Sequence, residues 1–157
     1  MNAEIGISEK NRKAVVGKLV TLLADEYVLY TKTRNAHWNL VSPDFHSVHV
    51  YFETLYEELE EKADSVAERI RKLGHYVPAS LKDFLQLTRL TEKLSEPNDS
   101  RGYIKELLAD HESIIIFIRE NIEAINNDYK DAGTADFLTG LMEDHETTAW
   151  MLRAHLK

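Results

Sequence analysis

The chain has 157 residues, of which 43% are hydrophobic and 29% are charged, a composition that fits one globular domain with a substantial core. It contains no cysteine, which excludes disulfide scaffolds, thiolate metal sites and thiol catalysis. The formal net charge is -8, and so acidic a chain is repelled by nucleic acid unless its basic residues gather in one place.

The sequence gives no sign of export or of a membrane anchor. The segment Met1 to Val16 lacks the apolar core of a signal peptide, and no run of 18 apolar residues occurs. We therefore expect a single domain over residues 1–157, located in the cytoplasm. The one candidate basic patch consists of Lys10, Arg12, Lys13 and Lys18. The alternative is that these are solvated side chains on the first turns of a helix, and with the acidic total charge this disfavours DNA binding.

Two long helices are predicted in the first half of the chain. Apolar residues recur at helical spacing from Ser8 to about Trp38. Residues 39–43 interrupt this spacing. A second helix opens at Ser42-Pro43-Asp44, with the proline near its first position, and ends at Gly74.

The second half predicts one short helix and two long ones. Ser80-Leu81-Lys82-Asp83 has the form of a capping box and begins a short helix. Pro97-Asn98-Asp99 opens a third long helix that stops near Asn126-Asn127, and a last one follows Gly133-Thr134. Because residues 74–98 are long enough to cross between parallel neighbours, we expect an all-α, ferritin-like four-helix bundle with a short extra helix in that link.

Four residues with metal-binding side chains share one side of the second helix: His49, Glu53, Asp64 and Glu68. His49 and Asp64 are roughly 22 Å apart along a helix, too far to hold one ion. The four positions are nevertheless symmetric about residues 58 and 59. If a second copy of the helix crossed antiparallel at that point, His49 would face the partner's Glu68 and Glu53 would face the partner's Asp64. The pattern therefore predicts metal sites formed between two subunits.

A fifth residue, His37, is a candidate ligand for the same metal sites. His37 ends the first helix on the side of its apolar residues, so it is expected to point inward, and a short turn lets it approach His49. Imidazole with carboxylate oxygens and no sulfur suits iron, manganese or zinc. The alternative is a charged, solvated helix face. Because the stripe borders an apolar edge, its carboxylates are expected to be partly buried.

The remaining histidines are assigned other roles. None of the seven has a glutamate three residues before it, which argues against a di-iron centre within one subunit. His46 lies on the stripe and is either an extra ligand or a histidine that contacts the ligands or faces solvent. His111 and His145 interrupt apolar helix faces, so we expect core histidines with hydrogen-bond partners.

The run Arg34-Asn35-Ala36-His37-Trp38-Asn39, a second histidine twelve residues later and Asp64-Ser65-Val66-Ala67-Glu68-Arg69 resemble the signature of the Dps family. These are the mini-ferritins, named as DNA-binding proteins from starved cells, and the resemblance covers essentially the whole chain. It implies His37 and His49 as ligands from one subunit, Asp64 and Glu68 as ligands from its two-fold partner, and Glu53 where the family usually has Asp. It also implies that Trp38 donates an electron beside the centre; packing at a helix end is the alternative.

The resemblance further implies a hollow dodecamer that oxidises Fe²⁺ at a two-iron interface site, mostly with hydrogen peroxide rather than O₂, and stores ferric oxide against oxidative damage. Asp136, and more loosely Asp131, match the carboxylates of the family's three-fold iron channels. As isolated residues, both are charges at a helix N-terminus. Two alternatives remain open: a DNA-organising protein with little ferroxidase activity, and a bundle that holds zinc or manganese as a structural clamp.

Overall fold

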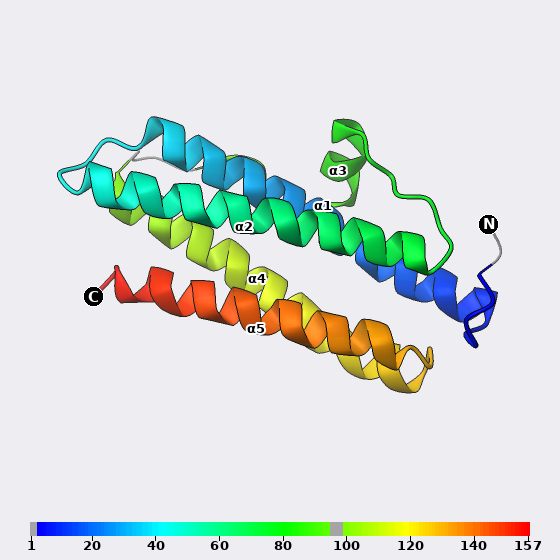
Figure 1. Ribbon diagram of the computed structural model, residues 1–157. Coiled ribbons are helices and arrows are strands. Elements are labelled where there is room, and N and C mark those ends of the chain that lie inside the picture. Colours follow the sequence, from blue (N-terminus) through cyan, green and yellow to red (C-terminus); the bar gives the residue numbers. More distant parts are fainter. Residues whose placement is uncertain (1–2, 95–98) are drawn as a thin grey trace.

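The computed structural model describes residues 3–94 and 99–157. These residues form five helices and no strand: α1 (Glu9–Asn39), α2 (Phe45–Lys72), α3 (Leu81–Leu87), α4 (Ser100–Asn127) and α5 (Ala132–Ala154). α1 pairs antiparallel with α2, α4 pairs antiparallel with α5, and the two hairpins pack together while the short α3 lies against α1 (Figure 1). Since α2 and α4 run in the same direction, the link that holds α3 is the expected crossover, and the ferritin-like bundle is confirmed (Figure 1).

The predicted helix starts are set by side chains that accept backbone N–H groups. Ser8 accepts the N–H of Asn11 at the start of α1, and Ser80 forms a complete capping box with Asp83 at the start of α3. Asp99 caps α4, whereas Pro97 and Asn98, predicted to open the same helix, lie outside the described residues.

Three helix boundaries differ from, or sharpen, the prediction. Pro43 lies in the turn before α2 and not in its first helical turn, because the helix begins only at Phe45. α5 begins at Ala132, ahead of the predicted Gly133-Thr134, because the Asp131 side chain accepts the N–H of Thr134. Gly74 ends α2 as expected, and its φ of 87° is a conformation that favours glycine.

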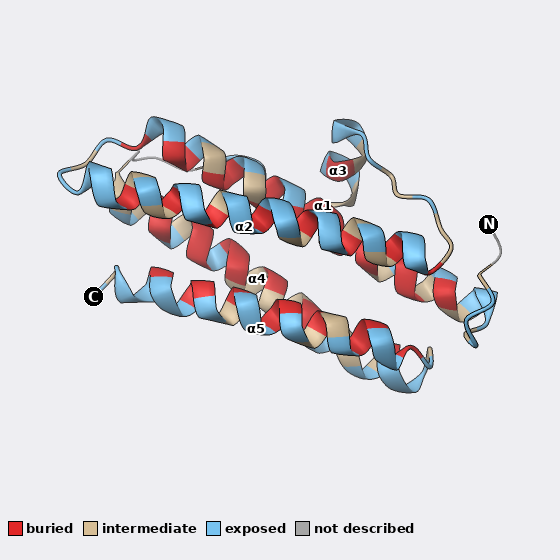
Figure 2. Ribbon diagram, viewed as in Figure 1, coloured by how far each residue is buried: buried red, intermediate tan, exposed pale blue. Residues whose placement is uncertain are grey.

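The bundle interior is filled by apolar side chains from all four long helices (Figure 2). The largest fully buried apolar side chains are Leu19, Leu22, Leu29, Phe52, Leu59, Ile70, Leu73, Tyr103, Ile104, Leu107 and Ile114. Burying one Leu, Ile or Phe side chain stabilises a fold by about 1.5–3 kcal/mol, so this core dominates the stability of the bundle. Among the described helices, none is long and apolar enough to cross a membrane.

Buried charges join α1 to its neighbours. The carboxylate of Asp25 accepts hydrogen bonds from the Thr88 hydroxyl at 2.8 Å and from the Arg89 backbone N–H at 2.7 Å, and it pairs with the Arg89 guanidinium. Lys32 pairs with Asp110 of α4. Burial raises the pKa of Asp110, and the ammonium group of Lys32 opposes that rise. These pairs join α1 to the segment after α3 and to α4.

Candidate metal centre

His37 and His49 face each other across the start of the α1–α2 hairpin, in reciprocal hydrogen bonds. The Nδ1–H of His37 donates to the backbone carbonyl of His49 at 2.9 Å, and the Nδ1–H of His49 donates to the carbonyl of His37 at 2.9 Å. The two rings stack with centroids 3.7 Å apart and planes 19° apart. The expected approach of the two imidazoles is confirmed, as is the burial of His37.

This geometry determines which nitrogen each ring offers to a ligand. A carbonyl oxygen only accepts, so Nδ1 of each neutral ring carries the proton and Nε2 keeps its lone pair. Within the described residues, neither Nε2 has a hydrogen-bond partner. Histidines that bind metals commonly donate their second N–H to a backbone carbonyl in this way, which fixes the tautomer and the ring orientation. Each ring of the pair is therefore oriented to offer its Nε2 to a cation.

Aromatic rings enclose the pair on two sides. The Phe45 ring stacks on His49 with centroids 4.8 Å apart, and the Tyr56 ring meets His37 edge-on at 5.3 Å. The Tyr56 hydroxyl donates to Oε1 of Glu53 at 3.3 Å. Burial raises the pKa of Tyr56, and the neighbouring Glu53 carboxylate raises it further. Glu53 is thus linked to the histidine pair through one phenol.

The three carboxylates predicted as ligands are exposed in the protomer: Glu53, Asp64 and Glu68. The expectation that they would be partly buried is wrong, because helical periodicity places them at the edge of the apolar face and the core ends before that edge. Glu68 lies 3.4 Å from the ammonium group of Lys72, and Asp64 lines a cavity of about 280 Å³ with Tyr27 and Tyr30. Each carboxylate is therefore available to a partner surface.

One protomer does not assemble a metal centre in residues 3–94 and 99–157, where no group of three His, Asp or Glu side chains could hold an ion. The histidine pair lies where the end of α1 meets the start of α2, whereas Asp64 and Glu68 lie four or more helical turns further along α2. The two parts of the predicted shell are therefore separate surfaces of the same subunit.

Two other residues near the pair are exposed. Trp38 is 65% exposed, and the guanidinium of Arg34 lies 5.2 Å from the centroid of its ring. This exposure does not fit the alternative that Trp38 merely packs at the helix end within the protomer. His46 is also exposed, consistent with its interpretation as a surface histidine.

The two residues proposed for an iron channel differ sharply. Asp131 is buried and accepts hydrogen bonds from the backbone N–H of Thr134 at 2.9 Å and from Arg69 at 3.1 Å. Its carboxylate thus caps α5 and pairs with α2, which favours the helix-terminus alternative for Asp131. Asp136 is exposed on the next turn of α5 and keeps its carboxylate available.

A second polar cluster, the core triad, lies in the centre of the bundle: Glu26 of α1, His111 of α4 and His145 of α5. Nε2 of His145 donates to Oε1 of Glu26 at 2.8 Å, and Nδ1 of His145 shares a hydrogen bond with Nδ1 of His111, also at 2.8 Å. The prediction that both histidines are core residues with hydrogen-bond partners is confirmed. Glu26 was missed, although it shares the spacing of the buried Leu22 and Leu29.

The core triad predicts a specific dependence of stability on pH. Burial lowers the pKa of His111 well below its usual value of 6.5, and His145 and Lys62 lower it further. The unfolded chain therefore binds a proton that the folded chain does not. The free energy of unfolding should be highest above about pH 6.5 and fall below it, by at most about 1.4 kcal/mol per pH unit. Denaturant unfolding at several pH values should show that the free energy of unfolding falls less steeply below pH 6.5 in His111→Leu than in the wild-type protein. An equally steep fall in both would mean that other groups cause the pH dependence.

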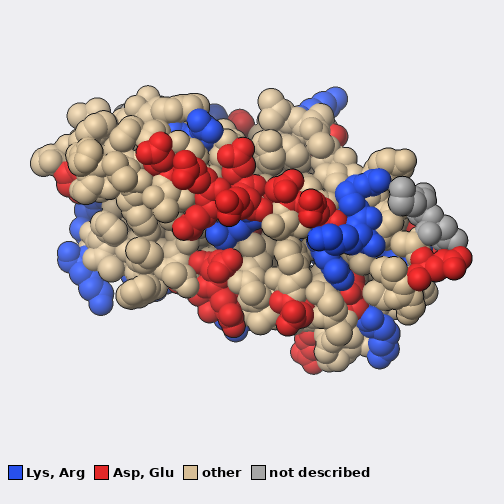
Figure 3. All heavy atoms as spheres, in the orientation of Figure 1, with Lys and Arg blue, Asp and Glu red and all other residues tan. Residues whose placement is uncertain are grey.

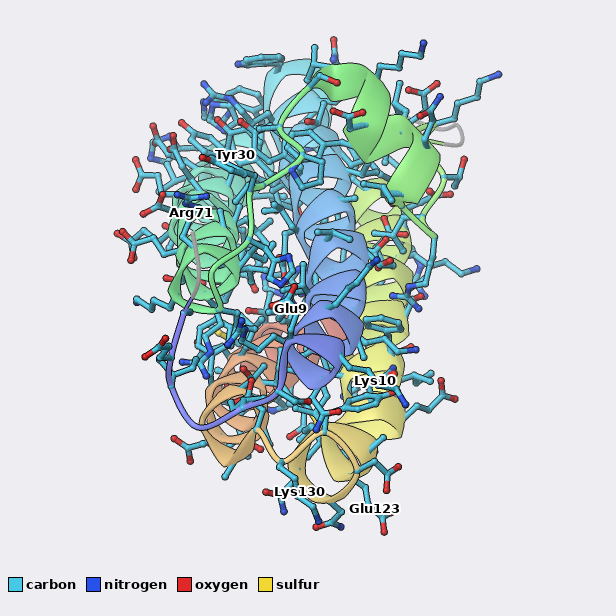
Figure 4. The ribbon with its side chains drawn as sticks, turned by 90° about the vertical axis from the view of Figure 1, so that its right-hand side faces the viewer. Glu9, Lys10, Tyr30, Arg71, Glu123 and Lys130 are labelled. Atoms are coloured by element: carbon cyan, nitrogen blue, oxygen red, sulfur yellow. The ribbon has the colours of Figure 1, made fainter. Side chains whose placement is uncertain are left out.

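The surface charge bears on the DNA alternative. Arg12, predicted to belong to a basic patch, is buried, because its guanidinium donates to the Ile7 carbonyl at 3.1 Å and pairs with Glu9 at 2.6 Å. The predicted patch is therefore wrong in one of its four members, while Lys10 is exposed on the first turn of α1 (Figure 4). On the face drawn in Figure 3, acidic side chains gather over the middle of α2 and over α5, and a smaller group of Lys and Arg side chains lies to their right, near the end of α2. Between these helices lies a cleft of about 680 Å³ lined in part by Glu58, Glu61 and Asp144.

Known proteins resemble this chain over nearly its whole length. Residues 16–157 match the family described as Ferritin: Ferritin-like domain. A low temperature-induced protein of Nostoc sp. is 42% identical over 153 residues, which cover 98% of this chain and 86% of that protein. DNA protection during starvation protein 2 of Bacillus anthracis is 33% identical and covers 92% of this chain and 97% of its own length.

Solved structures agree with these relatives. A Dps protein from Vibrio cholerae, described as a member of a broad superfamily of ferritin-like diiron-carboxylate proteins, superposes with a TM-score of 0.92 at 28% identity, covering 100% of this chain and 99% of its own. Dps from Thermosynechococcus elongatus gives 0.88 at 28% identity, covering 94% and 93%. The bundle and its crossover helix define a ferritin-like protein. Within that class, this chain belongs to the Dps family.

Proposed function

We propose that this protein oxidises Fe²⁺ at sites shared between two subunits and stores the ferric product as a mineral inside a hollow oligomer. The observation that carries the proposal is the pair of His37 and His49, whose Nδ1 atoms are bonded to backbone carbonyls, so that Nε2 of each ring is left for a ligand. Membership of a family that includes diiron-carboxylate proteins supports iron as the substrate metal.

The proposed ligands come from both subunits of a two-fold dimer. His37, His49 and Glu53 belong to one subunit, and the partner contributes its Asp64 and Glu68. The absence of a three-ligand group within the described residues of one protomer, together with the exposure of the three carboxylates, supports this division. Imidazole with several carboxylates suits Fe²⁺ and stabilises the higher charge of Fe³⁺. Glu53 replaces the family's usual aspartate, and its longer side chain stays within reach of Tyr56.

The proposed reaction consumes peroxide and ferrous iron together. Two Fe²⁺ ions each give one electron to one hydrogen peroxide molecule, so the O–O bond is cleaved by two electrons and no hydroxyl radical is released. In this scheme O₂ is the poorer oxidant, and Trp38, beside His37 in sequence, is a further electron donor. The exposed carboxylate of Asp136 is the better candidate for guiding Fe²⁺ through a three-fold channel, because the carboxylate of Asp131 is already bound by Arg69 and Thr134.

The proposal includes a dodecamer built from two-fold dimers and a cytoplasmic role in protection against oxidative damage, as the Dps resemblance implies. DNA organisation is the weaker alternative for this chain. Its net charge is -8, and Arg12 is withdrawn from the basic patch into contacts with its own helix start. A negative net charge opposes association with the phosphates of DNA.

The direct test adds Fe²⁺ and hydrogen peroxide to the purified, assembled protein. We expect ferric absorbance to rise faster than in protein-free buffer, while a spin trap for hydroxyl radical gives less signal. If the site instead holds zinc or manganese as a structural clamp, the protein should neither speed the rise of ferric absorbance nor lower the hydroxyl-radical signal. No acceleration by protein of intact assembly would refute the ferroxidase proposal.

A further inference from the structure

The cleft between α2 and α5 has the shape of a long groove, about 680 Å³ in volume. Its lining residues come from positions 51–65 of α2 and 137–151 of α5. At about 1.5 Å per residue, each of these stretches is roughly 21 Å long. Protein sites for small molecules usually have volumes of about 300–1,000 Å³, so the groove is large enough for an extended ligand.

The two helices are joined near both ends of the groove, so the space between them is bounded. At one end, the guanidinium of Arg69 on α2 donates to the carboxylate of Asp131, just before α5, at 3.1 Å. At the other end, the rings of Tyr51 and His155 stack with centroids 5.2 Å apart. The groove is therefore a fixed feature of the bundle and needs no rearrangement to admit a ligand.

The groove carries more negative than positive charge. Its lining includes three carboxylates and one ammonium group, those of Glu58, Glu61, Asp144 and Lys62. Nζ of Lys62 lies 3.7 Å from Oε2 of Glu58. In the part of the chain that the structure describes, Glu61 and Asp144 form no ion pair, and both are exposed. Two carboxylates are thus left for a cation from outside, on the acidic face drawn in Figure 3.

The floor of the groove is apolar and partly bare. Leu55 of α2 and Leu141 of α5 are buried beneath it, and Met151 contributes a further apolar side chain. Gly140 also lines the groove, and a Cβ atom added at this position would meet no atom within 4 Å. Glycine weakens a helix interior, and packing within the subunit does not require it at this position. The groove thus offers hydrocarbon contacts between its charged groups.

We propose that this groove binds a linear polyamine, whose ammonium groups pair with the carboxylates while its methylene chain lies on the apolar floor. A compact metal ion fits less well, because no three His, Asp or Glu side chains in residues 3–94 and 99–157 are grouped to hold one. Carboxylates spaced along a groove instead match ammonium groups spaced along a chain. None of the proposed iron ligands lines the groove, so the inference is independent of the ferroxidase function.

The test titrates spermidine into the assembled, iron-free protein at low ionic strength in an isothermal titration calorimeter. We expect saturable binding of one spermidine per subunit, weakened by added salt because exposed charges are screened. Mg²⁺ at the same concentration of charge should displace little spermidine, since a hydrated ion gains nothing from the apolar floor. Spermidine should also raise the melting temperature, because it stabilises the folded state to which it binds.

Two sets of variants locate the site. Gly140→Leu should abolish saturable binding, because the new side chain fills the groove, and leucine favours a helix more than glycine does. Its matched control is Gly17→Leu on α1, which also adds a side chain where no atom lies within 4 Å and should keep the wild-type affinity. Glu61→Gln and Asp144→Asn should each weaken binding by up to about fivefold, the effect of losing one exposed ion pair.

Three results would overturn the proposal: no saturable binding, as expected if a partner subunit covers the groove; displacement of spermidine by an equal charge of Mg²⁺; or an unchanged affinity in Gly140→Leu. If Gly140→Leu fails to assemble, the double variant Glu61→Gln/Asp144→Asn decides the question, because it replaces only exposed side chains. An unchanged affinity in the double variant would place spermidine elsewhere on the surface and refute the groove as its site.

Discussion

His49→Ala and Asp64→Ala subunits should each lose iron oxidation on their own, yet an equal mixture of the two should regain about one quarter of the wild-type rate. In an isologous dimer, each proposed site combines the histidines of one subunit with the carboxylates of the other. A mixed dimer therefore has one site with both lesions and one site with neither. Losing even a residue that only orients a metal ligand costs about 10–100-fold, so loss of a ligand should cost at least as much.

The measurement compares initial rates of ferric absorbance after the two variants are unfolded together and reassembled. The matched control mixes His37→Ala with His49→Ala, whose lesions lie in the same half of the site and cannot complement each other. Recovery in the first mixture alone would support the shared site. Equal behaviour of the two mixtures would mean that the ligands come from a single subunit.

Glu26→Ala should destabilise the bundle by about 1–3 kcal/mol, the typical cost of leaving a buried hydrogen-bonding group without its partner. The variant leaves the Nε2–H of His145 buried without an acceptor, and the removed side chain leaves a cavity. Glu26→Gln should lose less, because its amide oxygen can still accept from His145. Guanidinium unfolding followed by circular dichroism at fixed subunit concentration measures both changes.

Two further variants serve as references for Glu26→Ala: one that removes a surface carboxylate, and one that replaces the whole core triad by apolar residues. Glu123→Ala, on the exposed face of α4, should change the free energy of unfolding by less than about 0.5 kcal/mol (Figure 4). Replacing Glu26, His111 and His145 together by leucine should recover much of the loss, because no polar group is then left without a partner. A cost below about 1 kcal/mol for Glu26→Ala would mean that the core triad does not contribute to stability.

Much of the fold could be predicted from the sequence because its signals are local. The Ser80–Asp83 capping box, the glycine at position 74 and the apolar spacing of the long helices each act within a few residues. The start of α5 was missed because it depends on the Asp131 side chain, which is oriented by Arg69 from another helix. Tertiary contacts of that kind leave no periodic pattern in the sequence.

In the candidate site, too, the features set by local sequence could be predicted and those set by tertiary contacts could not. The approach of His37 and His49 follows from a short turn between two helices, but their reciprocal bonds to backbone carbonyls depend on the register of the hairpin. The burial of Glu26 was missed because two adjacent acidic residues on a helix, here Asp25 and Glu26, usually face solvent. The spacing of Glu26 with Leu22 and Leu29 nevertheless places it on the buried face. The ligand roles of Glu53, Asp64 and Glu68 stay predictions, since they concern a second copy of the chain.

The reciprocal bonds between His37 and His49 also bear on the order of events in a newly made subunit. They join residues only twelve apart, so they can form as soon as the first two helices close into a hairpin, before α4 and α5 are synthesised. Under the proposed division of ligands, however, such a subunit has no carboxylate opposite its histidines. Subunit pairing would then act as a checkpoint: an orphan chain would bind iron weakly and stay inactive toward peroxide until a second chain arrives.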